Sequence, residues 1–304
     1  MKTYFYRSIC ISAIMIYCCG VLSQIKNDRI VRFGGIILNT DRQQTIDNVL
    51  FGVYYQLTQK AFEYSKAIIV TDTLLLATGN SHSIFLDPFY KERLEISRKV
   101  RIERSKKVGR ANIEHENVDE IADLIGVNSD YREENNGDPV QIYKDRSTGI
   151  VSSVYNAFVD NLICKQQIEA FSQWVITDKT DTVFNYPCKM AKTVYAGRNY
   201  TAWFTLEIPV SDGPWKFHGL PGLILRVEDD EKLFQYMAIG LQQYHEKTEI
   251  VKDNVKYENC TLRQFNSFVK REKKRNLVNF YSGGQLYMTY RNSPITYINM
   301  EIEE

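Results

Sequence analysis

Residues 208–227, IPVSDGPWKFHGLPGLILRV, decide how this chain folds, because they join a turn-rich loop to the start of an apolar strand. Proline fixes φ in a turn, and glycine and aspartate favour turns for conformational reasons of their own. In residues 220–223, LPGL, this chemistry predicts a type II turn in which Gly222 takes a positive φ. An alternating apolar strand begins at Leu223. We expect six structural turn residues: Asp212, Gly213, Pro214, Gly219, Pro221 and Gly222.

The same loop carries aromatic side chains. Trp215 and Phe217 alternate with Lys216 and His218, and Trp203 lies in the strand before the loop. Tryptophan beside a conformationally fixed turn is typical of a groove for an apolar ligand or a partner. The commoner arrangement is a hydrophobic plug that closes one end of a sheet. If the groove exists, its candidate ligand-binding residues are Trp203, Trp215, Phe217, Arg198 and His218.

Residues 219–224 read GLPGLI, and here the chain resembles the GLPGLI family, a group of exported proteins of Gram-negative, Porphyromonas-type bacteria. YTAWF at 200–204, IP at 208–209 and SDGPWKF at 211–217 also resemble the family pattern. Weaker matches are the segments 53–57 and 83–85. The resemblance implies export but no established biochemical activity, so no catalytic or binding residue is transferred from it.

Strand patterns dominate the rest of the chain. Alternating or β-branched segments bounded by turn residues predict strands at 53–62, 67–76, 83–86, 140–143, 150–158, 168–177, 188–195, 200–205, 223–227 and 233–242. Residues 196–199, AGRN, predict a hairpin turn with Arg198 at its tip. We therefore expect a mainly β protein with a few helices. The expected architecture is a curved antiparallel sheet or an open half-barrel. It is similar to that of periplasmic lipoprotein carriers, an analogy that concerns the fold alone.

One helix is predicted near the C-terminus. Thr261 and Gln264 form a capping box, in which each side chain satisfies an amide at the helix start. An apolar stripe and a basic opposite side make this helix amphipathic. The stripe consists of Leu262, Phe265, Phe268 and Val269. Packing on the sheet is the favoured interpretation, and contact with anionic lipid is the alternative.

The N-terminus has the organisation of a signal peptide. Basic residues precede an apolar stretch, and Val21 and Ser23 suit cleavage before Gln24. The stretch is shorter than a membrane-spanning helix requires, and no later segment could span a bilayer. Lipidation at Cys18 or Cys19 is disfavoured by the bulky residue before Cys18. Residues 1–23 are thus a predicted leader, and we expect the protein in the periplasm or associated with the outer membrane.

The remaining residues, 24–304, are expected to form a single β-rich domain with a charged insertion at about 88–138. Residues 91–110 carry nine basic and three acidic side chains, whereas residues 114–138 carry nine acidic and one basic. The favoured interpretation is an exposed polar insertion or lid, and the alternative is a charged binding surface.

Composition narrows the function further. Without the leader, 36 basic and 37 acidic residues remain, so nothing favours nucleic acid as a partner. Four separated histidines and the cysteines at 164, 188 and 260 lack metal-ligand spacing, so we expect no metal or cofactor. Cys164, Cys188 and Cys260 allow at most one internal disulfide. Ser211, Asp212 and His218 lack the motif of a hydrolase nucleophile.

The sequence thus predicts a non-catalytic cell-envelope protein that binds an apolar or lipid-like ligand. Its alternative is an accessory protein for an outer-membrane receptor or assembly, and a hydrolase is the least favoured hypothesis.

Overall fold

The computed structural model describes residues 43–90, 138–156, 161–167, 173–244, 247–273, 275–282, 285–292, 295–298 and 300–301. The predicted leader lies outside the described residues, and so does the charged insertion apart from its ends, residues 88–90 and 138. Both remain predictions.

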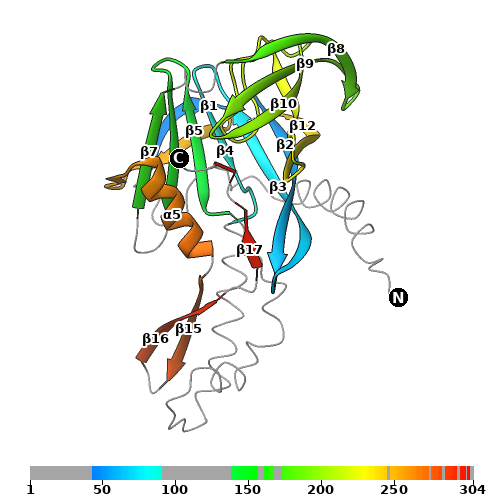
Figure 1. Cartoon of the computed structure of the whole chain (residues 1–304). Helices are drawn as coiled ribbons and strands as arrows, with labels where there is room; N and C mark the ends of the chain where they lie inside the picture. Colours follow the sequence, from blue (N-terminus) through cyan, green and yellow to red (C-terminus); the bar gives the residue numbers. More distant parts are fainter. Residues whose placement is uncertain are drawn as a thin grey trace, which may run out of the picture. The chain divides into compact units, whose positions relative to one another are not determined.

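Most of the described strands belong to one large sheet (Figure 1). Its members in chain order are β2 (Phe51–Glu63), β3 (Lys66–Thr78), β4 (His82–Leu86), β5 (Val140–Asp145), β6 (Ile150–Asn156), β7 (Asn161–Gln167), β8 (Val175–Val183), β9 (Tyr186–Tyr195), β10 (Arg198–Thr205), β11 (Leu223–Asp229), β12 (Phe234–Gln243), β14 (Glu258–Asn259) and β17 (Ile295–Tyr297). Their order across the sheet is β14-β7-β6-β5-β4-β3-β2-β12-β11-β10-β9-β8, and β17 also pairs with β2.

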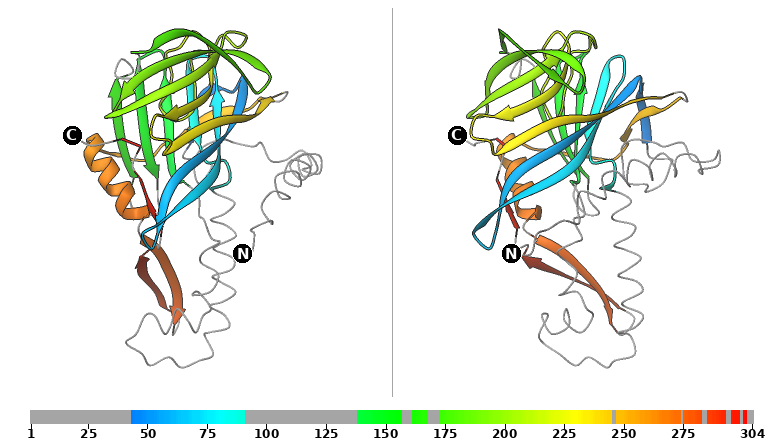
Figure 2. Two further views of the ribbon diagram at one scale, coloured as in Figure 1. Left: turned by 45° about the vertical axis from the view of Figure 1, so that its right-hand side comes forward. Right: turned by 90° about the vertical axis from the view of Figure 1, so that its right-hand side faces the viewer.

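The sheet is antiparallel except where the short β14 runs parallel to β7. Within the described residues β8 and β14 do not pair with each other, so the sheet stays open. Figure 2 shows its strands curving and twisting strongly from β7 to β8. The prediction of a mainly β fold built on a curved, open sheet is confirmed.

Each face of the sheet carries its own core. The face that we call inner packs against the 208–222 loop, and its core contains Tyr55 and Phe204 of the sheet and Phe217 of the loop. The outer face contains Leu75, Ile84 and other buried side chains. It is covered by the two-stranded pair of β1 (Gln43–Asn48) and β13 (Glu249–Asp253), since Ile250 of β13 belongs to the same core. The long pairing of β2 with β12 joins distant parts of the chain.

The predicted helix is α5 (Leu262–Lys273), and it packs beside β7. Its capping box forms: the Gln264 amide donates to Thr261 Oγ1 at 3.3 Å, and the Thr261 amide donates to Gln264 Oε1 at 2.9 Å. The amphipathic character is weaker than predicted, because only Phe265 of the apolar stripe is buried. The other three apolar residues are half-buried against Tyr155 and Cys164. After α5, β15 (Arg275–Ser282) pairs with β16 (Gln285–Asn292), a hairpin that the sequence analysis missed.

The hairpin turns are tighter than predicted. Tyr195 pairs directly with Arg198, so the β9–β10 turn has two residues, Ala196 at φ 45° and Gly197 at φ 76°. Two positive φ values are the geometry of a type I′ turn, whose twist matches that of the flanking strands. Arg198 therefore begins β10 and is not at the tip of the turn. The strand predicted at 168–177 overlaps β8 only at its last residues, because β8 begins at Val175 and continues to Val183.

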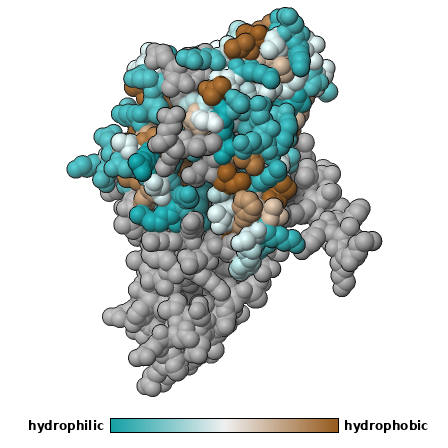
Figure 3. All heavy atoms as spheres, viewed as in Figure 1, coloured by the Kyte–Doolittle hydropathy of each residue, from teal (hydrophilic) through white to brown (hydrophobic). Residues whose placement is uncertain are grey.

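The described residues on the face shown in Figure 3 are mainly hydrophilic, with separate groups of apolar residues among them. The most exposed large apolar side chains include Tyr64, Val175 and Val194. Within the described residues, α5 is too short and too polar to cross a membrane.

Candidate ligand-binding site

Asp212 anchors the 208–222 loop to the sheet. Its carboxylate is 1% exposed and lies 2.5 Å from Nζ of Lys144 in β5. Its other oxygen accepts from Arg146 at 3.0 Å and from the Thr78 hydroxyl at 3.2 Å. Burial acts to raise the pKa of Asp212, but Lys144 and Arg146 together hold it below its usual value. Asp212 is therefore an ionised structural anchor, which extends its predicted role in the turn.

Lys144 fixes the loop backbone as well. Its ammonium group donates to the carbonyl oxygens of Gly213 at 2.6 Å and Phe217 at 3.3 Å. Burial lowers the pKa of Lys144, and Asp212 counteracts that shift. Directly after the loop, the Tyr55 hydroxyl donates to the carbonyl oxygen of Ile224 in β11 at 2.6 Å. The loop itself is thus held by buried polar contacts to β3 and β5.

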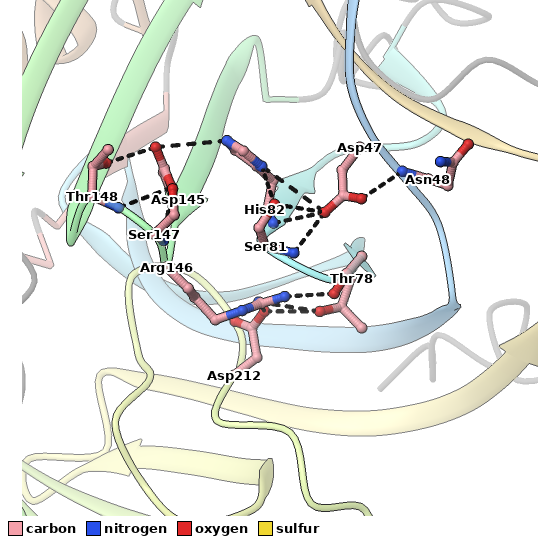
Figure 4. A network of polar contacts seen from close by, with 11 residues as sticks. Asp47, Asn48, Thr78, Ser81, His82, Asp145, Arg146, Ser147, Thr148 and Asp212 are labelled. Atoms are coloured by element: carbon pink, nitrogen blue, oxygen red, sulfur yellow. Dashed lines mark hydrogen bonds and ion pairs between the residues drawn. The ribbon is translucent and has the colours of Figure 1, made fainter.

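Arg146 links this anchor to a second polar network near the β3–β4 and β5–β6 turns (Figure 4). Asp47 accepts from the backbone amides of Ser81 and His82 at 2.7 and 2.9 Å. Asp145 accepts four hydrogen bonds from Ser147 and Thr148. Burial acts to raise the pKa of Asp145, but these bonds lower it to about 2. Each carboxylate satisfies turn amides, so the network is structural.

One glycine of the loop, Gly222, has a different role from the one predicted. Gly222 is not in the left-handed region, so the predicted type II turn with a positive φ at Gly222 is wrong. A Cβ at Gly222 would overlap the carbonyl oxygen of Thr205, which means that close approach of two backbones requires the glycine. The positive φ values fall instead at Gly219, 94°, and Trp215, 51°. Pro214 accepts from the Phe217 amide at 3.0 Å, which closes a turn around Trp215.

The candidate aromatic residues lie in three different surroundings. Phe217 is fully buried between the rings of Tyr200 and Trp215, at centroid distances of 4.8 and 5.2 Å. Trp215 is half-buried and also contacts the ring of Tyr195. Trp203 packs against the same inner core, and the Arg226 guanidinium lies 4.7 Å from its ring centroid.

The two polar candidates are held by the fold. Arg198 is 9% exposed, donates to the carbonyl oxygen of Met300 at 3.2 Å and pairs with Glu231 at 3.3 Å. His218 is buried, and its Nδ1 lies 2.8 Å from the carbonyl oxygen of Lys216. Ser211 accepts from the Gly219 amide at 3.1 Å, so the serine and the histidine both stabilise the loop.

A cavity of about 150 Å³ lies between the inner face of the sheet and α5. Most of its wall is apolar and comes from β2, β3, β4, β5, β12 and α5. Representative side chains are Leu57, Leu74, Phe85, Ile142, Tyr236 and Phe265. Trp215 also lines the cavity, whereas the other four candidate residues do not. The structure thus places one predicted residue in a site whose other members the sequence analysis missed.

A buried ion pair borders this cavity. Nζ of Lys216 lies 2.5 Å from Oε1 of Glu301, and the two side chains are 3% and 5% exposed. Tyr195 donates to the same oxygen, and Asn266 of α5 donates to Oε2 at 2.9 Å. Lys216 also donates to Gln166 of β7 at 2.8 Å. The network connects the loop, β7, β9, α5 and the C-terminal segment.

Ser153 of β6 contributes the other distinctive polar group. The residue is 1% exposed, and within the described residues its hydroxyl has no hydrogen-bond partner. It lines the cavity and lies in register with Ile142 of β5 and Cys164 of β7. No local pattern singles out Ser153, because a serine in a buried strand usually satisfies its hydroxyl within the fold.

No disulfide joins the cysteines of the described region. Cys164, Cys188 and Cys260 are free thiols. Burial raises the pKa of Cys164 and of Cys188 to about 11, so both remain protonated at neutral pH. Within the described residues, no group of three or more His, Cys, Asp or Glu side chains is arranged to hold a metal ion.

A family model described as "Protein of unknown function (Porph_ging)" matches residues 154–226. The match runs from β6 to β11 and includes the whole anchored loop. It agrees with the resemblance to an uncharacterised family of Porphyromonas-type bacteria. No curated protein sequence matches the chain.

Two solved structures are similar to this chain over part of their length. They are titled "Structure of PNGF-II in P21 space group" and "Structure of PNGF-II in C2 space group". The sequence identities are 11% and 12%, and each alignment has a TM-score of 0.44. Each covers 75% of this chain and 35% of the other, so the chain spans about a third of those proteins. Similarity at this level does not identify a function.

Proposed function

We propose that this protein is a non-catalytic binding protein of the cell envelope, and that its cavity holds a small apolar group. The observation that carries the proposal is the cavity of about 150 Å³ with a mainly apolar wall. Ligand sites are typically concave and apolar, with few polar groups that orient the ligand. The size suits one aromatic ring or a short acyl segment, and not a lipid with two complete chains.

The position of α5 supports the same function. Phe265 and Val269 of α5 close the cavity against the sheet, and Trp215 contributes from the loop. Only Phe265 of the helix is buried, and α5 touches few other elements. A weakly packed element beside a cavity is suited to admitting a ligand, because local opening costs least where few apolar contacts must break.

The test is binding of ethylbenzene, measured by its effect on the thermal unfolding midpoint. A ligand that binds only the folded state raises this midpoint as its concentration rises. We expect a rise in the wild type and none in Val269→Phe, which fills the cavity from α5. Ser267→Phe adds the same ring to the exposed side of α5 and should retain the rise. A wild-type protein that does not respond would refute the proposal.

The envelope location rests on the predicted leader. Its test is the intact mass of the protein expressed with its own N-terminus in a Gram-negative host. A mass that corresponds to a chain beginning at Gln24, recovered from the periplasm, would support export. A full-length chain in the cytoplasm would contradict it.

A further inference from the structure

The short strand β14 brings two cysteines together at its edge of the sheet. We propose that Cys164 and Cys260 are a modification site, at which a small-molecule disulfide such as oxidised glutathione converts the two thiols into an internal disulfide. Cys188 stays a thiol under the same conditions. The structure describes the form in which all three residues are thiols. The inference concerns how the chain before α5 is attached to the sheet, so it does not rest on the proposed function.

The first argument is the register of the two strands. Asn259 of β14 pairs with Ile163 of β7 in a parallel arrangement, so the next pair along the two strands is Cys260 and Cys164. The Cys260 amide donates to the carbonyl oxygen of Ile163 at 3.0 Å, which holds the chain beside β7 at this point. Paired strands lie about 4.7–4.9 Å apart, within the Cα separation of about 4.4–6.8 Å that a disulfide requires.

The second argument is that both side chains belong to the same small apolar cluster. Cys164 is 2% exposed and packs with Tyr155 and Phe265, and the half-buried Cys260 packs against this cluster. Sγ of Cys260 lies 3.6 Å from the carbonyl oxygen of Ile163, the residue before Cys164. This sulfur therefore already lies beside β7, and the two sulfurs can meet without a change of strand register.

Cys188 has different surroundings, although it is buried to the same extent as Cys164. It belongs to the larger core of the inner face, and its thiol donates to the carbonyl oxygen of Tyr186 at 3.4 Å. Its cross-strand neighbour in β8 is Asp181, a carboxylate and not a thiol. Cys188 is therefore the matched control for the pair.

Accessibility sets the order of the two exchange steps. Cys260 is half-buried, so its thiolate attacks the small disulfide first, which forms a mixed disulfide and releases one small thiol. The Cys164 thiolate then attacks Sγ of Cys260 and releases the second small thiol. The two cysteines lose two electrons, the small disulfide gains them, and both protons end on the released thiols. An oxidising compartment, to which the predicted leader would direct the chain, supplies such an oxidant.

The bond would restrain the chain in two ways. It would close a loop that contains the strands from β8 to β13 and the 208–222 loop, and a cross-link of a long loop stabilises a fold mainly by restricting the unfolded chain. It would also fasten the segment directly before α5, which begins at Leu262 and packs beside β7 (Figure 1). Oxidation would thus attach the start of α5 to the sheet.

The experiment uses the full chain after its three leader cysteines have been replaced by serine, at Cys10, Cys18 and Cys19. The reduced protein is incubated with oxidised glutathione at pH 8.5, because burial raises the pKa of Cys164 and of Cys260. The remaining thiols are then alkylated, and linked peptides are identified by mass spectrometry. The thermal midpoint is measured before and after oxidation, and circular dichroism checks that each variant is folded.

We expect one linked pair of peptides, which contains Cys164 and Cys260, and one alkylated thiol at Cys188. Oxidation should raise the thermal midpoint by roughly 5–15 °C, and dithiothreitol should reverse the rise. Cys188→Ala should retain both the link and the rise, whereas Cys260→Ala should lose both.

Three results would overturn the inference. A persistent mixed disulfide of Cys260 with glutathione would show that Cys164 does not reach it. Links that include Cys188 as often as Cys164 would remove the selectivity for one pair. Three alkylated thiols after the incubation would show that neither residue of the pair reacts. Each result is read from the protein that retains Cys164, Cys188 and Cys260, so the conclusion does not depend on the stability of a variant.

Discussion

Replacing Glu301 by glutamine should destabilise the protein strongly, because the substitution leaves Lys216 charged and buried. The two side chains are 5% and 3% exposed, and 2.5 Å separates Nζ from Oε1. Glu301 also accepts hydrogen bonds from Tyr195 and Asn266, one on each oxygen. Glutamine keeps the shape, but its NH₂ group would face one of these donors. Removing one partner of a buried pair costs about 3–5 kcal/mol.

The assay is urea unfolding followed by tryptophan fluorescence, with the free energy of unfolding extrapolated to water. A matched control is Glu231→Gln, because Glu231 also pairs with a largely buried cation, Arg198, but is itself 69% exposed. An exposed carboxylate of this kind contributes less than about 1 kcal/mol. Glu301→Gln should therefore reduce the free energy of unfolding several times as much as Glu231→Gln does. The m-value should be unchanged in both variants.

A double-mutant cycle with Lys216→Met separates the ion pair from the other bonds of Glu301. Residues that share a buried network show coupling energies of about 0.5–3 kcal/mol. We expect the double variant to be more stable than the sum of the single losses predicts. Equal effects of Glu301→Gln and Glu231→Gln, or strict additivity in the cycle, would refute the reasoning.

Three further predictions follow from the loop and the turns. The pKa of Asp145 is lowered to about 2 in the folded state, so its stabilising contribution should be present above about pH 4 and lost as the pH falls towards 2. The difference in unfolding free energy between the wild type and Asp145→Asn, measured from pH 2 to 6, should therefore shrink below about pH 4. A difference that stays constant would contradict this. Gly222→Ala should lower the free energy of unfolding by about 1–3 kcal/mol or more, because the new Cβ would overlap the backbone of Thr205. Gly240→Ala, where a Cβ meets only ordinary contacts, should lower it less in the same urea assay. Equal losses of stability would contradict the close approach of the two backbones. Ala196→Asn should raise stability by roughly 0.5–1 kcal/mol, because asparagine tolerates the positive φ of a type I′ turn better than alanine does; a lower thermal midpoint would contradict that.

The sequence analysis identified the elements that local patterns define. Alternating apolar residues located β2, β3, β9 and β11 to within a few residues, and the capping box located the start of α5. These signals act between neighbours in the chain, so a single sequence contains them. β7 was missed, and only the start of β8 was included in a predicted strand. β8 is exposed along nearly its whole length, so it lacks the alternation that marks a half-buried strand.

Tight turns show where local patterns were insufficient. The β2–β3 turn is formed by Tyr64 and Ser65, and the β8–β9 turn by Phe184 and Asn185, all four at positive φ. Tyrosine and phenylalanine rarely adopt this conformation, so no sequence rule would place them there. The pairing of long strands on both sides imposes it. Gly222 illustrates the same limitation, because its reason for being glycine is a distant backbone and not its own φ.

The candidate site was predicted only in part. Trp215 was identified from its loop, and the aromatic plug interpretation describes Phe217 well. Ser153 and Glu301 were missed because their importance arises from three-dimensional contacts. Lys216 and Glu301 are 85 positions apart, and nothing near either residue indicates the other. A functional group formed from distant strands is visible only when the sheet has been assembled.

The late position of Glu301 has a consequence for how the molecule is made. Synthesis proceeds from the N-terminus, so Lys216 leaves the ribosome well before the residue that neutralises it. Tyr200 and Tyr236 are likewise synthesised before Met300, which accepts hydrogen bonds from both hydroxyls. Until Met300 and Glu301 have been synthesised, one buried cation and two tyrosine hydroxyls of the inner core lack these partners, so the completion of this network is a late step in the folding of the domain.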